Sequence, residues 1–301
     1  MFDWSGHVLE FEAAGPWRPP EFPGSMLRGA FGSALKRLAC VMRLRDCSGC
    51  PLEFACVYTS IFETRPPPGA GVMTRYDRAP HPFVLVVGLD EAGESGRLSV
   101  GVRLFGEATR AAPFALRALE DAAARGLGAS RTPFRLVAAG PEGERPTPWT
   151  GGTWLPARPR NAPPPWPETT HVRFATPLRL KRDGRLLTPE TLTGPDIAMT
   201  LVRRLGLLAT FFGRDGAGLD FPSLKAAAAR VRLLEPKVVW RDLFRRSSRQ
   251  NARLGIGGVV GSARLDLGPD ETLRRVMAWA PVLHVGKGAS MGLGRVELVG
   301  A

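Results

Sequence analysis

The sequence lacks the features of membrane and secreted proteins. In 301 residues, no apolar run approaches the length needed to cross a bilayer. The first residues, MFDWSGHVLEFEAAG, contain neither the basic region nor the apolar stretch of a secretory signal. With 44% hydrophobic residues, the chain has the composition of a folded protein. We therefore expect a folded cytoplasmic protein with no membrane partner.

Acidic residues are also scarce relative to basic ones. Lys and Arg number 41 against 28 Asp and Glu, which gives a formal net charge of +13. The pI of about 10.8 lies above the value of roughly 9 that is typical of nucleic-acid-binding domains. A basic soluble protein from an arginine-rich proteome would look similar. The arginines of this chain cluster, however, and clustering favours a nucleic-acid partner.

The two halves of the chain have the same expected order of elements. Periodicity in the first half predicts β-α-β-β-α-β over residues 7–13, 25–40, 82–89, 97–106, 107–126 and 133–140. The second half repeats this order over residues 170–181, 196–212, 237–244, 257–267, 270–280 and 295–300. The pattern predicts an α+β protein of two tandem ferredoxin-like domains, an architecture shared with RNA-recognition domains.

The boundary between the halves follows from composition. Residues 141–167 are rich in proline and glycine, contain isolated tryptophans and show no helical or strand period. We therefore place an N-terminal domain at 1–145, a linker at 146–167 and a C-terminal domain at 168–301.

All cysteines fall in one short segment, with the spacing C-x6-C-x2-C-x5-C: Cys40, Cys47, Cys50 and Cys56. Disulfides are improbable in the cytoplasm. Four thiolates with an internal C-x-x-C can hold zinc or an iron–sulfur cluster. The outer spacings differ from those of common zinc fingers, so the metal is not identified, and four free thiols are the alternative. We expect a structural metal site that holds an insertion at 40–63, after the first helix.

A glycine-rich segment, GKGASMGLG at 286–294, precedes the last expected strand. A Walker loop needs Gly-Lys followed by Ser or Thr, and a dinucleotide fingerprint needs a following helix, so both nucleotide readings fail. The loop amides could instead contact a nucleic-acid backbone. The residues predicted for this contact are Gly286, Lys287, Gly288, Gly292, Gly294 and Arg295. A flexible hairpin is the alternative.

Among the histidines, His284 lies next to this glycine-rich loop. It is the histidine that we expect to reach a bound phosphodiester, where an imidazole serves as general acid or base. A hydrogen-bonded surface histidine is the alternative. His7 and His171 fall in strand-like runs, and His81 stands between prolines in an expected turn.

The densest basic run is WRDLFRRSSRQNARLG, in which two aromatic residues are interleaved. Arginine matches phosphate geometry, and aromatic rings can stack on bases. We predict RNA contacts here, with a solvated charged face as the alternative. The residues are Arg241, Arg245, Arg246, Arg249, Gln250 and Arg253.

Several segments together resemble a known family. They are MLRGAFGSALKRLAC followed by CSGCPLEFACVYTSIFE, HPFVLVV with LSVGVRLFGEA, GLGASRTPFRL, SSRQNARLGIGGVVG, and LHVGKGASMGLGRVEL. In this order they resemble the CRISPR-associated endoribonucleases that process precursor CRISPR RNA, members of the RAMP superfamily. A glycine-rich loop before the final strand is the hallmark of that superfamily.

The resemblance implies two ferredoxin-like domains, binding of CRISPR repeat RNA and contact with other CRISPR effector subunits. It also implies cleavage that needs no metal or other cofactor. A ribose 2′-oxygen attacks the adjacent phosphate and leaves a 2′,3′-cyclic phosphate and a 5′-hydroxyl. Such chemistry requires in-line positioning, proton transfer and cations around the phosphorane.

The sequence departs from the family in its first helix, where many members carry a catalytic histidine. Arg28, Lys36 and Arg37 occupy this helix, and Tyr58 follows in the cysteine segment. We therefore predict that these four residues, together with His284, form the catalytic set. The missing histidine keeps a non-catalytic CRISPR-RNA-binding subunit as an alternative. A redox protein with a cluster on its cysteines is a lesser alternative.

Overall fold

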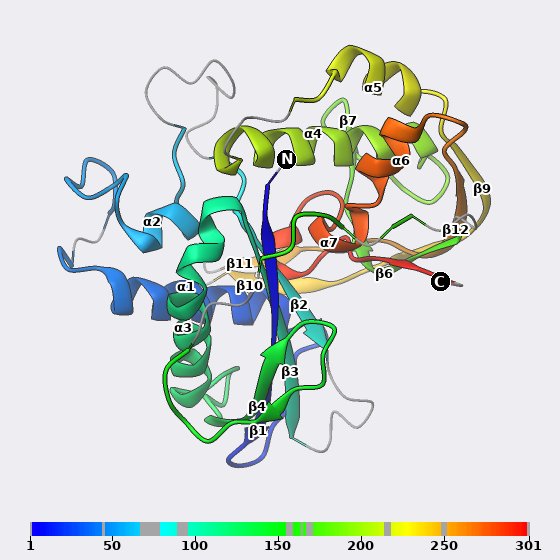
Figure 1. Cartoon of the computed structure of the whole chain (residues 1–301). Coiled ribbons are helices and arrows are strands. Elements are labelled where there is room, and N and C mark those ends of the chain that lie inside the picture. The colour runs from blue at the N-terminus through cyan, green and yellow to red at the C-terminus, as the bar shows by residue number, and fades with distance from the viewer. Residues whose placement is uncertain are drawn as a thin grey trace. The chain divides into compact units, whose positions relative to one another are not determined.

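The computed structural model of the chain describes residues 2–43, 46–66, 79–88, 96–154, 159–163, 165–166, 171–213, 218–247 and 252–299. Contacts between residues divide the chain into two compact units (Figure 1). Unit 1 comprises Met1–Asn161 and Leu207–Gly216, and unit 2 comprises Ala162–Gly206 and Ala217–Ala301.

Unit 1 is built on an antiparallel sheet with the strand order β2-β3-β1-β4-β5. The strands are β1 (Trp4–Ala13), β2 (Phe83–Gly88), β3 (Arg97–Phe105), β4 (Phe134–Pro141) and β5 (Thr147–Pro148). The helices are α1 (Gly24–Ala39), α2 (Val57–Phe62), the 3₁₀ helix η1 (Gly106–Ala111) and α3 (Ala112–Ala124). With α1 and α3 as the two crossovers, the order β4-β1-β3-β2 is the ferredoxin-like arrangement predicted from the sequence.

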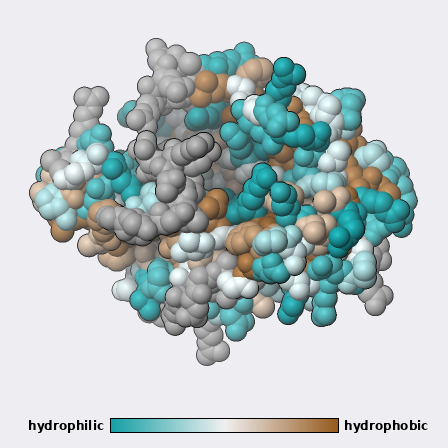
Figure 2. All heavy atoms as spheres, turned by 90° about the horizontal axis from the view of Figure 1, so that it is seen from above, coloured by the Kyte–Doolittle hydropathy of each residue, from teal (hydrophilic) through white to brown (hydrophobic). Residues whose placement is uncertain are grey.

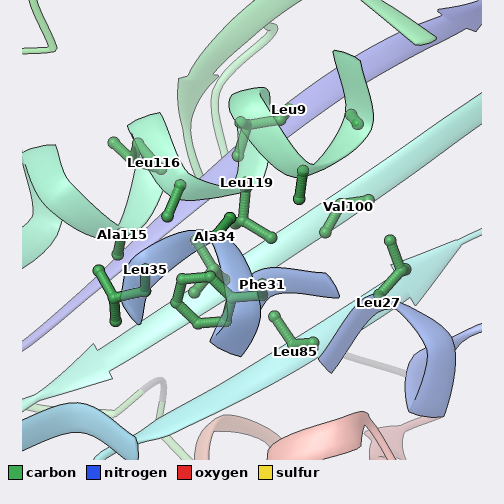
Figure 3. Packing of buried hydrophobic residues seen from close by; sticks show 14 of the residues in the cluster. Leu9, Leu27, Phe31, Ala34, Leu35, Leu85, Val100, Ala115, Leu116 and Leu119 are labelled. Atoms are coloured by element: carbon green, nitrogen blue, oxygen red, sulfur yellow. The ribbon is translucent and has the colours of Figure 1, made fainter. Parts of the chain in front are cut away.

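The core of unit 1 lies between the two long helices and the sheet (Figure 3). Helix α1 directs Leu27, Phe31 and Leu35 toward this layer, and none of the three is more than 3% exposed. Small side chains on α3, such as Ala115, let the two helices approach closely. Burial of one Leu or Phe side chain contributes about 1.5–3 kcal/mol, so this layer supplies much of the stability of unit 1.

Unit 2 repeats the same topology, with the strand order β13-β6-β12-β9. Its strands are β6 (His171–Leu178), β7 (Lys181–Arg182), β8 (Arg185–Leu186), β9 (Arg232–Arg241), β10 (Phe244–Ser247), β11 (Ala252–Gly255), β12 (Gly258–Asp266) and β13 (Val296–Leu298). Its helices are α4 (Gly194–Phe212), α5 (Phe221–Ala228), α6 (Glu271–Met277), α7 (Ala280–Leu283) and η2 (Ala289–Met291). The predicted duplication is therefore confirmed at the level of fold.

Helix α4 contributes to both units, because its last residues from Leu207 onward group with unit 1. Gly106, at the start of η1, has a left-handed φ of 56° and lies against the backbone of Phe212. A Cβ atom at this glycine would collide with the Phe212 carbonyl, so the close approach requires glycine.

Part of the predicted linker is ordered on unit 1. Thr147 and Pro148 form β5 against β4, and the indoles of Trp149 and Trp154 stack with a centroid distance of 4.2 Å. Both indole N–H groups donate to the Glu120 carboxylate of α3, at 3.2 and 3.1 Å. A two-residue strand has no periodicity, which is why the sequence pattern did not indicate it. Residues 155–158, 164 and 167 lie outside the described residues.

The face drawn in Figure 2 is mainly polar where its residues are described. On the face drawn in Figure 2, hydrophobic residues form patches among hydrophilic ones. None of the helices described has the length and apolar character needed to cross a membrane.

His7 is a buried polar residue at the centre of β1, with 5% of its surface exposed. Its Nε2 atom lies 3.3 Å from the Ser5 hydroxyl. Burial lowers the pKa of the His7 imidazole to about 4, although the Glu142 carboxylate favours the charged form. The folded chain therefore keeps this ring neutral at pH values where the unfolded chain protonates it.

We expect this histidine to destabilise the protein in mild acid. Between about pH 6.5 and the folded pKa of about 4, the unfolded state binds more protons, so stability falls as pH falls through this window. At pH 5 the loss from His7 is about 2 kcal/mol. Urea denaturation at pH 7 and pH 5 should show a smaller acid loss in His7→Gln than in the wild type. Equal losses in the two proteins would contradict this account.

Candidate functional site

Helix α1 separates apolar and cationic side chains on two faces. Its inward residues pack in the core of unit 1, whereas Lys36 and Arg37 occupy its last turn. Cations there interact favourably with the carboxyl end of the helix dipole. Arg28 is half-buried, and Arg37 is exposed.

Three of the predicted catalytic residues, Arg28 and Lys36 of α1 and Tyr58 of α2, lie along the contact between these two helices. The Lys36 ammonium is 5.4 Å from the centroid of the Tyr58 ring, which is stacked on Phe62 at 5.8 Å. The Arg28 guanidinium lies 5.4 Å from the Phe62 ring, and its Nη2 atom is 2.7 Å from His81 Nε2. We call Arg28, Lys36, Tyr58, Phe62 and His81 the α1–α2 row.

The sequence analysis did not select His81 or Phe62. The guanidinium of Arg28 is always protonated, so it donates and His81 Nε2 accepts. The imidazole is therefore the neutral tautomer with its proton on Nδ1. The sequence around His81 gives no sign of its contact with Arg28, because the contact forms only when β2, which follows His81, pairs within the sheet.

The same helix end lines a hollow of about 610 Å³. Its described lining residues are Ser33, Lys36, Arg37, Cys40 and Arg43. Three of these five are cationic and none is a carboxylate, which is the composition expected of an anion-binding surface. Lys36 and Arg37, the fourth residue of unit 1 predicted to be catalytic, thus line the same hollow.

His284 lies elsewhere and is buried. It is fully enclosed in unit 2, with 0% of its surface exposed and a left-handed φ of 57°. Its Nδ1 atom is 3.2 Å from the Leu293 carbonyl oxygen, and its backbone N–H donates to the Ala280 carbonyl at 3.1 Å. The structure thus places this ring beneath the glycine-rich loop, and its proposed catalytic role remains a prediction.

The glycine-rich loop uses much of its backbone within unit 2. The amides of Lys287 and Gly294 donate to the carbonyls of Arg179 and Pro177, both at 3.0 Å. Gly288 and Gly292 flank η2 with left-handed φ values of 84° and 91°. Several loop amides are therefore occupied by protein acceptors. The exposed Lys287 side chain is the group of this loop that is open to a ligand.

The strand predicted for 237–244 is confirmed as far as Arg241, where β9 ends, and the basic run continues into the hairpin β10–β11. Between β9 and β10, the Asp242 carboxylate accepts from the Trp240 indole at 2.8 Å. On the hairpin, the Arg253 guanidinium lies 4.0 Å from the centroid of Phe244, which is 50% exposed. Arg241 is also exposed, and Arg245 is half-buried.

Some predicted RNA-binding residues are not described. Arg249 and Gln250 lie outside the described residues, and the side chain of Arg246 is likewise not described. Arg295 is half-buried and pairs with Glu297 at 3.0 Å.

The four-cysteine metal centre stays a prediction. Cys47 is buried and the other cysteines are half-buried. Among the residues that the structure describes, no group of three or more His, Cys, Asp or Glu side chains is placed to hold a metal ion. Burial raises the pKa of the Cys47 thiol, and the nearby Lys36 ammonium opposes that rise.

These features define a tandem ferredoxin-like protein with cationic groups on the first helix of unit 1 and on the hairpin of unit 2. Residues 172–296 match the family model described as CRISPR-associated endoribonuclease Cas6, and residues 4–150 match a model described as an N-terminal domain (AF_1859_N). The resemblance seen in the sequence is thereby confirmed. The family model thus covers the sheet and most of the helices of unit 2.

Solved structures show the same fold. A Cas6 (TTHB231) product complex has a TM-score of 0.60 at 18% identity and covers 99% of both chains. A Cas6 (TTHA0078) product complex has a TM-score of 0.56 at 19% identity, covering 98% of this chain and 99% of that one. A Cas6-related protein from Pyrococcus furiosus has a TM-score of 0.53 at 9% identity and covers 99% of both chains. No curated protein sequence matches the chain.

The α1–α2 row depends on a glycine in α1. A Cβ atom added at Gly32 would lie 2.8 Å from Phe62 Cε1, whereas one added at Gly29 would meet nothing within 4 Å. The ring of Phe62 is itself buried, with 6% exposed. Gly32 is therefore the position at which α2 can pack directly on α1.

We expect alanine to act oppositely at these two glycines. Gly29→Ala should raise the free energy of unfolding by about 0.5–1 kcal/mol, because alanine favours the helix. At Gly32, overpacking costs about 1–3 kcal/mol and exceeds that gain, so Gly32→Ala should be less stable than the wild type. Chemical denaturation of the two variants measures this, and equal stabilisation of both would refute the packing argument.

Proposed function

We propose that the chain is a metal-independent endoribonuclease that binds CRISPR repeat RNA and cleaves it to mature CRISPR RNA. The observation that carries the proposal is the cationic end of α1, with its hollow, in a chain whose residues 172–296 match the Cas6 family model. Cleavage would proceed by attack of a ribose 2′-oxygen on the adjacent phosphate. The products are a 2′,3′-cyclic phosphate and a 5′-hydroxyl.

The residues of unit 1 suit the charge changes of this reaction. The phosphorane transition state carries more negative charge than the substrate, and fixed cations stabilise it selectively. Lys36 and Arg37 line the hollow and are our candidates for this role. The Tyr58 hydroxyl, which donates to Glu63 at 3.2 Å, is a candidate for proton transfer.

Arg28 and His81 extend this set along the α1–α2 row. Because His81 Nε2 accepts from Arg28, the pair holds the guanidinium in one orientation. We propose that Arg28 contacts the RNA backbone and that His81 positions it. His284 is a weaker candidate for proton transfer, since its ring is enclosed in unit 2.

The hairpin of unit 2 supports RNA binding. Phe244 is half exposed, and the Arg253 guanidinium lies over its ring; an aromatic ring combined with an arginine can stack on unpaired bases. We propose repeat RNA as the partner of this surface. Other CRISPR effector subunits are a further proposed class of partner.

The alternative is a non-catalytic subunit that holds CRISPR RNA. Two observations favour it: α1 carries no histidine, and His284 is buried. Binding of repeat RNA without cleavage would support this alternative.

Cleavage itself is the first test. Purified full-length protein is incubated with repeat-containing RNA in EDTA, and the product ends are analysed. We expect 2′,3′-cyclic phosphate ends without added divalent metal. Lys36→Ala should slow single-turnover cleavage by about 10²–10³-fold, because one stabilising cation is lost. The control Arg125→Ala removes an exposed arginine at the end of α3 and should cleave at the wild-type rate. Unchanged cleavage by Lys36→Ala would remove this residue from the mechanism.

Stacking on the hairpin is tested by binding. Phe244→Ala should weaken the affinity for repeat RNA by about 5–150-fold, the equivalent of roughly 1–3 kcal/mol for one stacked base. Phe114→Ala, which removes another exposed phenylalanine on α3, is the matched control. If both variants bind as the wild type does, the hairpin is not an RNA contact.

A further inference from the structure

The four cysteines share one small cavity even though they are not at ligand distances from a common point. A cavity of about 20 Å³ is lined by Cys40, Cys47, Cys50 and Cys56. The chain has no other cysteine, so all its thiols meet here. The remaining described lining residues come from the same segment and from the ends of α1 and α2, and include Asp46 and Tyr58.

The backbone around the cavity is arranged as in thiolate sites. Cys47 and Cys50 close a tight turn, in which the Cys50 N–H donates to the Cys47 carbonyl at 3.2 Å. Gly49 within this turn has a left-handed φ of 72°. The Arg43 N–H donates to Cys40 Sγ at 3.2 Å. Such N–H···S bonds orient a sulfur ligand and stabilise its negative charge.

The cavity between the cysteines has room for a single ion. Its volume of about 20 Å³ is close to the roughly 10–15 Å³ needed for one water molecule. Four thiolates are the ligands of closed structural zinc sites. The neighbouring Lys36 and Arg43 are cations that offset the charge of such a site.

We propose that Cys40, Cys47, Cys50 and Cys56 bind one zinc ion as a four-thiolate structural site. Binding draws the four sulfurs together around the ion and releases their thiol protons to solvent. Cys40 is the C-cap of α1 and Cys56 is the N-cap of α2. The ion therefore links the ends of the two helices that carry Lys36 and Tyr58.

This site does not depend on the proposed nuclease activity, and its test uses no RNA. Full-length protein is purified under reducing conditions, equilibrated with zinc, dialysed and analysed for zinc, iron and sulfide. We expect one zinc per chain and neither iron nor acid-labile sulfide. Replacement by cobalt should give the visible bands of a tetrahedral thiolate complex. Removal of zinc by a strong chelator should lower the melting temperature.

Variants assign the ligands. Cys47→Ser and Cys50→Ser should each lose bound zinc, whereas Ser48→Ala, in the same turn, should keep one zinc per chain. If the cysteine variants fail to fold, the zinc content and cobalt spectrum of the wild type still decide the question. A wild-type chain that retains no zinc overturns the proposal. Stoichiometric iron with sulfide also overturns it, in favour of a cluster.

Discussion

The contact between Phe62 and the backbone of α1 determines where the candidate catalytic groups lie. Phe62 packs on Gly32 and makes edge or tilted contacts with Phe31 at 5.0 Å and Phe83 at 4.9 Å. These partners come from α1 and β2, so the ring ties α2 to the core of unit 1. Tyr58 and Arg28 then lie on the remaining sides of the same ring. An apolar contact in the core thus arranges polar groups at the surface.

The two units use one topology for different purposes. In unit 1, the segment with the cysteines and helix α2 lie between the first helix and the second strand. Unit 2 instead has the β10–β11 hairpin between its second and third strands, and the glycine-rich loop before its last strand. In each unit the pairing of the four sheet strands is the same. The candidate functional residues therefore lie on the exposed side of α1 and in connections between strands, where the sheet that both units share places little demand on sequence.

Much of the fold could be predicted from the sequence, because strands and long helices have a local signature. The alternation in β1 and the apolar spacing of α1 and α3 follow directly from which face each element buries. The hairpin was not predicted because β10 and β11 have only four residues each, too few to show a clear alternation. Packing decides such cases, and packing is not local.

In the candidate site, too, some residues could be predicted from the local sequence and others depend on packing. Arg28, Lys36 and Tyr58 were identified from the first helix and the segment after it, and the structure brings them together along the stacked rings of Tyr58 and Phe62. His81 was not, since its contact with Arg28 joins positions 53 residues apart. The burial of His284 was equally invisible. It results from a left-handed backbone and from loop amides bonded to β6 and the residue after it, more than 100 residues earlier in the chain.

Helix α4 has a consequence for how the protein is made and taken apart. Residues Leu207–Gly216 group with unit 1, although they are synthesised after the first strand of unit 2. Gly106 packs against the backbone of Phe212, so this contact forms only after Phe212 has been synthesised. During synthesis, the whole sheet of unit 1 leaves the ribosome before the part of α4 that packs in unit 1 has been made. Unit 1 therefore completes its packing only while unit 2 is being synthesised, and the folding of the two units overlaps in time. A fragment that ends at Asn161 would expose the surface that this part of α4 covers, so a cut in the sequence between the two sheets does not yield a whole domain.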